Sequence, residues 1–183
     1  MKKQIFHNLF VLELANNHWG SLRRGKQIIK QFATVAKRNN VKAAIKLQFR
    51  DVKNFIHKDY LNEGKGSELG DLPKRSRYIQ KTAKTQLSSE DFAKLIDYIR
   101  KHDCIPMTTC FDEKSVDWAV SMDIPIIKVA SSDINDWILL NKLAKAKKPV
   151  ILSTGGAKEK QVDDVVKFFT NRKIPLAINH CVS

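Results

Sequence analysis

Six short apolar runs along this chain end in polar or charged residues, and this pattern constrains the fold more than any other feature. Lys46 and Lys128 each sit at the end of a run typical of a β-strand. A lysine at the end of a strand is typical of a parallel sheet that binds an anionic ligand at the carboxyl ends of its strands. The runs are Val11-Leu12-Glu13, Lys46-Leu47-Gln48, Met107-Thr108-Thr109, Ile127-Lys128, Ile151-Leu152-Ser153 and Ile178-Asn179-His180. The pattern predicts that six strands direct polar groups to one place.

Helical periodicities lie between these runs. Phe92, Leu95, Ile96 and Ile99 share one side of a helix that opens at residues 87–91, with Ser88 or Ser89 as its N-cap. The other expected helices cover 22–37, 113–121, 136–146 and 158–170, and the expected strands cover 10–14, 41–49, 105–109, 125–129, 149–153 and 174–180. Strict alternation of strand and helix predicts a parallel sheet in the α/β class.

Two parallel architectures fit this alternation, the open doubly wound sheet and the closed (β/α)8 TIM barrel. Polar residues at the end of every strand favour the barrel, because an open sheet concentrates function at one switch point. Neither GxGxxG nor GxxxxGK[ST] occurs, which weakens dinucleotide and nucleotide triphosphate alternatives. A barrel needs eight strands and about 250 residues. We therefore expect residues 1–183 to be the amino-terminal part of a barrel domain, incomplete at about six βα units.

Residues 50–86 form a polar, basic stretch with glycines at 64 and 66. It is too long for an ordinary βα connection. We expect it to form a mobile flap over the site, because function often resides in such loops.

Composition narrows the class of protein. The formal net charge is +14, but the basic residues are spread along the chain without an aromatic-rich stripe. We expect these basic residues to lie on solvated helix surfaces and to steer anionic metabolites, and we do not expect a nucleic-acid partner.

No apolar run reaches the roughly 20 residues of a membrane helix, and no secretory signal is evident, so we expect no membrane partner and a cytoplasmic location. Three cysteines without a CxxC pair indicate reduced, partly buried thiols.

The first candidate group lies after the first expected strand. Glu13 is followed by Asn17, His18 and Gly20, that is, a carboxylate at a strand end and a glycine that permits a tight turn. The carboxylate suits a general acid or base. The alternative is structural, with Glu13 capping a backbone amide and His18 packed on the surface.

The two lysines at strand ends are stronger evidence for an anion-binding site together than either is alone. A barrel would place Lys46 and Lys128 at one rim with hydroxyl and amide donors from Gln48, Thr109, Ser131 and Ser153. Such a cluster suits a ligand with phosphate and carboxylate groups. The segment 153–157 resembles a turn whose amides bind an anion at a helix start, or a tight connection. Lys128 could also be the Schiff-base lysine of an aldolase, whereas a serine hydrolase is disfavoured because no GxSxG occurs.

Taken in order, the motifs resemble the sialic acid synthase (N-acetylneuraminate synthase) family from about residue 8 onward. The matching segments are Glu13-x-x-x-Asn17-His18-x-Gly20, Ile45-Lys46-Leu47-Gln48, Thr109-Cys110-Phe111-Asp112, Ile127-Lys128-Val129-Ala130-Ser131-Ser132-Asp133-Ile134, Lys148-Pro149-Val150-Ile151-Leu152-Ser153-Thr154-Gly155 and His180-Cys181-Val182-Ser183. The resemblance implies a transferase of sialic acid biosynthesis that condenses phosphoenolpyruvate with an N-acetylated sugar aldehyde. The product is a nine-carbon 2-keto sugar acid, and phosphate is released.

The resemblance also assigns roles. It implies phosphoenolpyruvate binding by Lys46, Thr109, Lys128, Ser131, Ser153 and Ser183, sugar-side contacts by Gln48 and Asp133, and a catalytic role for Glu13 near the reacting carbon. Asp133 stands where some members carry glutamate, so the sugar is not assigned. The resemblance further implies a divalent metal, Mn or Mg, whose ligands lie beyond this chain, a carboxy-terminal antifreeze-like domain, and a homodimer when full length. The remaining alternatives are a Schiff-base aldolase and an inactive basic binding fragment.

Overall fold

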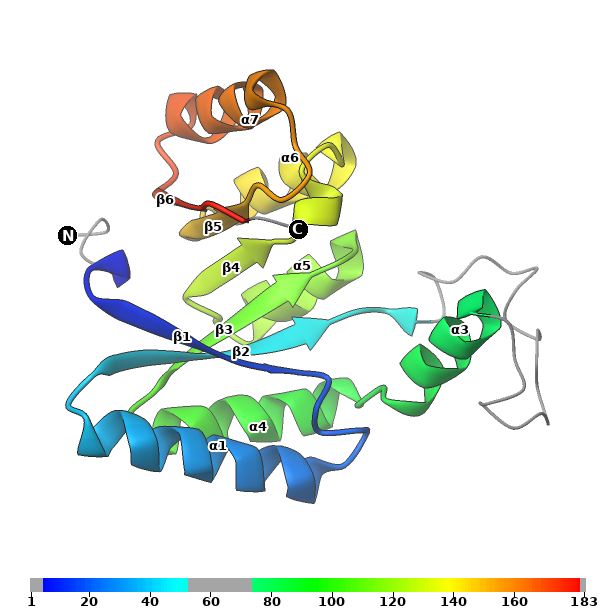
Figure 1. Cartoon of the computed structure of the whole chain (residues 1–183), viewed down its shortest axis with the longest axis vertical. Helices are drawn as coiled ribbons and strands as arrows, with labels where there is room; N and C mark the ends of the chain where they lie inside the picture. Colours follow the sequence, from blue (N-terminus) through cyan, green and yellow to red (C-terminus); the bar gives the residue numbers. More distant parts are fainter. Residues whose placement is uncertain (1–4, 53–73, 182–183) are drawn as a thin grey trace.

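The computed structural model describes residues 5–52 and 74–181 and contains a parallel sheet of six strands in sequence order. The strands are β1 (Leu9–Ala15), β2 (Lys42–Phe49), β3 (Ile105–Cys110), β4 (Ile126–Val129), β5 (Val150–Ser153) and β6 (Leu176–Asn179). Every neighbouring pair is parallel, and the sheet curves into a half-barrel (Figure 1). The prediction of an α/β fold and a partial TIM barrel is confirmed.

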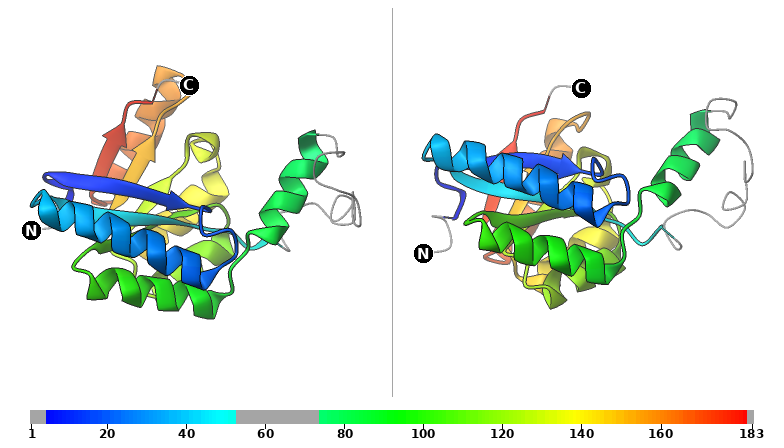
Figure 2. Two further views of the ribbon diagram at one scale, coloured as in Figure 1. Left: turned by 60° about the horizontal axis from the view of Figure 1, so that its bottom comes forward. Right: turned by 90° about the horizontal axis from the view of Figure 1, so that it is seen from below.

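Helices cover the convex face of this sheet. They are α1 (Leu22–Arg38), α4 (Ser89–Lys101), α5 (Glu113–Ser121), α6 (Trp137–Ala146) and α7 (Glu159–Asn171). Figure 2 shows α1 and α4 side by side beneath the first strands. Their bounds agree with the sequence-based prediction to within one or two residues. Within the described ranges, no helix is both long and apolar enough to cross a membrane.

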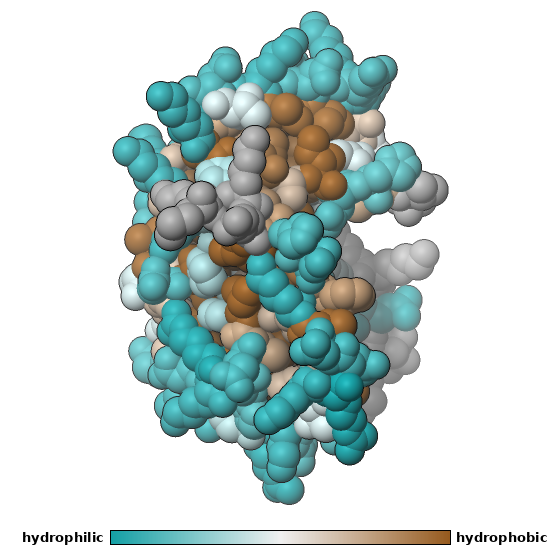
Figure 3. Space-filling model, turned by 90° about the vertical axis from the view of Figure 1, so that its left-hand side faces the viewer, coloured by the Kyte–Doolittle hydropathy of each residue, from teal (hydrophilic) through white to brown (hydrophobic). Residues whose placement is uncertain are grey.

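Side chains of β2 alternate between the apolar core beneath the helices and the concave face of the sheet. Ile45, Leu47 and Phe49 are fully buried in the core beneath the helices. Successive side chains of a strand point to opposite faces, so Ala44 and Lys46 share the concave face. Ala44 belongs to a second apolar cluster at the amino ends of the strands, where apolar atoms gather in Figure 3. The concave face is therefore apolar at one end and polar at the other.

Side-chain caps fix where the helices begin. In each cap, a side-chain oxygen accepts a hydrogen bond from the backbone N–H three residues later, which would otherwise have no partner at the start of a helix. The caps are Ser21 for α1, Ser88 for α4, Asp112 for α5 and Asp136 for α6. Of the two serines expected to start α4, Ser88 holds the role.

The last part of the segment 50–86, for which the sequence analysis predicted a mobile flap and no helix, forms the helix α3 (Lys74–Lys84). The helix lies beyond the carboxyl ends of β1 and β2 (Figure 1). Its sequence is strongly basic, and the only buried aliphatic side chain within its described part is Ile79, so few apolar residues mark this helix in the sequence. Residues 53–73 of the expected flap lie outside the described residues.

Candidate active site

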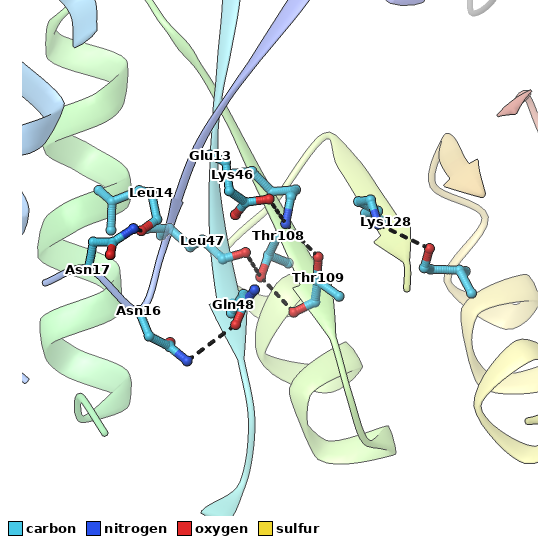
Figure 4. Close-up of polar contacts among 11 residues, drawn as sticks. Glu13, Leu14, Asn16, Asn17, Lys46, Leu47, Gln48, Thr108, Thr109 and Lys128 are labelled. Carbon is cyan, nitrogen blue, oxygen red and sulfur yellow. Dashed lines mark hydrogen bonds and ion pairs between the residues drawn. The ribbon is translucent and has the colours of Figure 1, made fainter. Parts of the chain in front are cut away.

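Lys46 forms the centre of a polar group on the concave face, which we call the lysine cluster: Glu13, Lys46, Thr109 and Lys128 (Figure 4). The Lys46 side chain is only 3% exposed. Its Nζ lies 2.6 Å from Glu13 Oε2 and donates to Thr109 Oγ1 over 2.8 Å. A buried ammonium needs such partners because desolvation of an unpaired charge is costly. The cation is thus held in a fixed position before any ligand arrives.

Strand register brings these side chains together. Glu13 pairs with Lys46 across β1 and β2, and Thr109 pairs with Lys128 across β3 and β4. Gln48 pairs with Thr109 on the other side. Aligned residues of parallel strands point to the same face, so residues far apart in sequence meet at one edge.

Lys128 is half-buried near the first lysine. Its Nζ lies 3.5 Å from the Val129 carbonyl oxygen. Burial lowers its pKa, and the positive charge of Lys46 lowers the pKa further, while Cys181, Glu13 and Asp133 act in the opposite direction. Two cations close enough to repel each other on one face are a suitable receptor for a doubly charged anion.

Ser131 follows β4, the strand of Lys128, and Ser153 is the last residue of β5. The Gly155 N–H donates to Ser131 Oγ over 3.1 Å, which ties the β4 and β5 loops together. A Cβ on Gly155 would lie 3.0 Å from that oxygen and 3.3 Å from the Cys181 Cβ, so a side chain there would displace its neighbours. Ser153 is buried, and its hydrogen bond to Cys181 is the main cause of a lowered pKa of that thiol.

The segment after β5 is a tight connection. The amide of Gly155 is taken by Ser131, and the Thr154 and Ala157 amides donate to the carbonyl oxygens of Asn179 and Thr154. These amides are therefore engaged within the protein. The interpretation of this turn as an anion site built from backbone amides is not supported by this arrangement.

Asp133 ends the short 3-10 helix Ser131–Asp133. Its Oδ1 accepts from the Ser132 hydroxyl over 2.7 Å, and its Oδ2 is buried with no hydrogen-bond partner among the described residues. Burial raises the pKa of this carboxyl, and the charges of Arg50 and Lys128 partly offset the rise. The carboxyl therefore lies within electrostatic reach of both Lys128 and Arg50.

Gln48 and Asn16 border a second region, the side cavity, which lies between the β1–α1 loop, the end of β2 and α3. It has a volume of about 330 Å³. The Asn16 amide donates to Gln48 Oε1 over 3.2 Å. Asn16 and Arg50, which both line the cavity, were missed by the sequence analysis. For Arg50 a signal existed, since it continues the every-second-residue pattern of Lys46 and Gln48.

The alternative in which His18 packs on the surface does not hold, because its side chain is fully buried. Its Nδ1 accepts the Gly20 N–H over 3.1 Å, and its ring stands edge-on to Phe92 at 6.1 Å. Burial lowers its pKa to about 4. Nor is a backbone-capping role supported for Glu13, because its carboxylate forms an ion pair with Lys46. His18 thus supports the β1–α1 loop from within.

Two predictions concern groups that the described residues do not contain. Ser183 lies beyond the described residues. No group of three or more His, Cys, Asp and Glu side chains that could hold a metal ion occurs within residues 5–52 and 74–181. The described residues therefore do not fit a divalent metal site.

All three cysteines are free, with Cys104 and Cys110 buried and Cys181 half-buried, as expected from the sequence.

Comparison with known proteins places this chain in a family. The sequence pattern of the NeuB family matches residues 33–183. The chain belongs to the NeuB family. A relative in Methanocaldococcus jannaschii, an uncharacterized protein, is 32% identical over 168 residues, covering 91% of this chain and 44% of that protein.

Two solved structures share the architecture. A putative spore coat polysaccharide biosynthesis protein E from Chromobacterium violaceum superimposes with a TM-score of 0.86 at 35% identity, over 96% of this chain and 49% of that one. An N-acetylneuraminic acid (sialic acid) synthetase from Leptospira borgpetersenii, in complex with citrate, gives 0.78 at 25% identity, over 96% and 54%. Other relatives are named as synthases of N,N'-diacetyllegionaminic acid, N-acetylneuraminate-9-phosphate and pseudaminic acid. The chain spans about half the length of the first curated NeuB relatives it matches.

Proposed function

We propose that the intact protein is a transferase that condenses phosphoenolpyruvate with an N-acetylated sugar aldehyde of the N-acetylmannosamine type. The product is a nine-carbon 2-keto sugar acid, and phosphate is released. The observation that carries the proposal is the buried Lys46, paired with Glu13 and Thr109 and accompanied by Lys128 on the same face. A ligand with a carboxylate and a phosphate matches this pair of cations.

In this proposal, the carbon–carbon bond forms when C3 of phosphoenolpyruvate attacks the aldehyde carbon, whose oxygen takes up a proton. Water then adds to C2, the C2–O bond to phosphate breaks, and C2 becomes a ketone. Lys46 and Lys128 hold the anionic groups, with Thr109, Ser131, Ser153 and Ser183 as hydroxyl donors. Glu13 takes the proton from the attacking water.

Gln48 and Asp133 contact the sugar in this proposal. Gln48 borders the side cavity, and Asp133 lies within reach of Lys128, so both lie next to the lysine cluster. We further propose an eight-stranded barrel, an antifreeze-like domain and a homodimer for the intact protein. A divalent metal, Mn or Mg, would supply Lewis-acid chemistry from ligands outside the described residues.

The test is phosphate release and 2-keto acid formation by the intact protein, given phosphoenolpyruvate and a panel of N-acetylated hexosamines. Lys128→Ala should lower kcat/KM for phosphoenolpyruvate by a factor corresponding to roughly 2–4 kcal/mol, because a desolvated charge pair is broken. Lys145→Ala, which removes a lysine from the outer helix α6, is the matched control. Wild-type kinetics for Lys128→Ala would refute the anion-binding role.

A Schiff-base aldolase is the second candidate, and the lowered pKa of Lys128 favours it, because an imine forms from the neutral amine. Borohydride reduction in the presence of pyruvate or a 2-keto sugar acid separates the two reactions. A stable adduct on Lys128 would support the aldolase. The proposed condensation leaves the lysine unmodified.

A further inference from the structure

The side chain of Gln48 is oriented by Asn16, where the lysine cluster borders the side cavity (Figure 4). The Asn16 Nδ2 group donates to Gln48 Oε1 over 3.2 Å, and the contact is partly buried. Within residues 5–52 and 74–181, the Gln48 amide nitrogen donates to no acceptor of the protein. A glutamine amide has one oxygen and two N–H donors. Because its oxygen is turned to Asn16, Gln48 offers its N–H groups to a ligand.

An irregularity in β1 brings Asn16 to this position. The register between β1 and β2 shifts between Glu13 and Ala15, where β1 has one residue more than its partner. With regular pairing Ala15 would lie opposite Gln48, and the shift sets Asn16 there instead. Ala15 adopts a left-handed conformation with φ of 48°, which is uncommon for a residue with a Cβ. Bulges of this kind re-aim side chains next to active sites.

The loop around Asn16 is held by groups other than its side chain. The Asn17 N–H donates to the Leu14 carbonyl oxygen over 3.0 Å, and the Trp19 N–H donates to the Asn16 carbonyl oxygen over 2.9 Å. The buried ring of His18 supports the loop from within. A change of the Asn16 side chain therefore leaves these contacts in place and removes the hydrogen bond to Gln48.

Positive charges on either side of Gln48 explain why its amide needs a partner. Lys46 and Arg50 lie two residues before and two residues after it, and alternate residues of a strand share a face. Amide dipoles turn in the local field, and a cation attracts the amide oxygen and repels the N–H groups. These charges would draw the oxygen of Gln48 toward the concave face. The donor group of Asn16 opposes this rotation.

We propose that Asn16 is a positioning residue that fixes Gln48 as a hydrogen-bond donor to a sugar oxygen that can only accept. The carbonyl oxygen of an N-acetyl group is such an oxygen, whereas a hydroxyl group could also bind a glutamine that is turned over. This inference rests on the proposed function. It adds to that function a residue that does not touch the substrate and the polarity of the contact made by Gln48.

The experiment compares two variants of Asn16 in the intact protein. Asn16→Asp keeps the size of the side chain but offers only acceptors, so the Gln48 amide should turn over and present its oxygen to the sugar. Asn16→Ala leaves the amide free to adopt either orientation. We expect KM for N-acetylmannosamine to rise about 10-fold in Asn16→Asp and roughly 2- to 3-fold in Asn16→Ala, with kcat unchanged. Equal effects of the two variants would overturn the positioning role, because a role in loop structure predicts no difference between them.

The same variants in a Gln48→Ala background show whether Asn16 acts through Gln48. Asn16→Asp should have no further effect on KM for the sugar there, since the group that it turns is absent. An undiminished effect would overturn the proposal. An effect of the added charge itself would fall on KM for the anionic phosphoenolpyruvate and weaken at high salt, so a defect with this pattern would also overturn it.

Asn141→Asp is the matched control, because it makes the same exchange on the outer helix α6, where the Asn141 amide donates to the Trp137 carbonyl oxygen. It should keep wild-type kinetics. Failure of the wild-type protein to consume any N-acetylated hexosamine would refute the condensation and the role of Asn16 with it. An active wild type whose Asn16→Asp variant behaves like Asn16→Ala would refute the positioning role alone.

Discussion

Strand ends build the lysine cluster, whereas a loop and a helix build most of the side cavity. The lysine cluster is fixed by sheet register, and its central cation is 3% exposed. In the side cavity, Trp19 and Tyr78 are 60% and 52% exposed and come from the β1–α1 loop and α3. Elements with few buried contacts change more readily than strands. The comparison suggests that the sheet fixes the common chemistry and that the cavity sets the choice of sugar.

The strongest test of this division is removal of the buried cation. Lys46→Met replaces the ammonium by an apolar group of similar length and leaves Glu13 without its partner. We expect kcat/KM for phosphoenolpyruvate to fall by an amount corresponding to roughly 3–5 kcal/mol, because the ligand loses a desolvated charge contact. Steady-state kinetics, with circular dichroism to confirm folding, measure the effect. A folded variant whose only defect is sugar affinity would reverse the proposed division.

The second test concerns the carboxylate beside that cation. Glu13→Gln keeps the shape of the side chain and removes the base, so turnover should fall about 10²-fold or more. Affinity for phosphoenolpyruvate should stay near normal or improve, because a negative charge next to Lys46 is removed. Pre-steady-state binding and turnover separate the two quantities. Intact turnover would leave Glu13 as a positioning residue.

The sequence predicted the lysine cluster better than the side cavity, for physical reasons. Lys46 and Lys128 interrupt apolar runs, and strand periodicity then fixes the face to which they point. The helix α3 was missed because Ile79 is its only buried aliphatic side chain in the described part. The burial of His18 could not be read from the sequence, because the residue lies in a loop and its contact with Phe92 joins segments far apart in the chain. The alternation of apolar and polar residues predicts which face of a strand each side chain occupies. The burial of a loop residue depends on contacts with segments far away in the sequence.

His18 links the two regions through the β1–α1 loop, and its burial predicts a pH dependence of stability. Its pKa is about 4 in the folded protein and near 6.5 when unfolded. Between these values the unfolded state binds more protons, so stability is full above pH of about 6.5 and falls as the pH drops toward 4. We expect a loss of stability on the order of 1–3 kcal/mol across this window.

Urea unfolding of the intact protein between pH 4 and 7 measures this dependence. His18→Asn retains an acceptor for the Gly20 N–H but cannot take up a proton, so its stability should be lower at every pH and its slope in this window should be reduced. His7→Asn, at an exposed position, is the control and should keep the wild-type slope. Identical slopes for His18→Asn and wild type would assign the acid sensitivity to other groups.

The smallest expected effect lies where the two regions meet, at Asp133. Its carboxyl is within electrostatic reach of Lys128 and Arg50, and we place it against the sugar hydroxyls. Asp133→Asn keeps the size of the side chain and exchanges one acceptor for a donor, so one hydrogen bond of about 1 kcal/mol is lost. We expect KM for the sugar to rise roughly 5-fold with KM for phosphoenolpyruvate unchanged. A rise confined to phosphoenolpyruvate would instead join Asp133 to the lysine cluster, and the boundary between the two regions would then pass between Asp133 and Arg50.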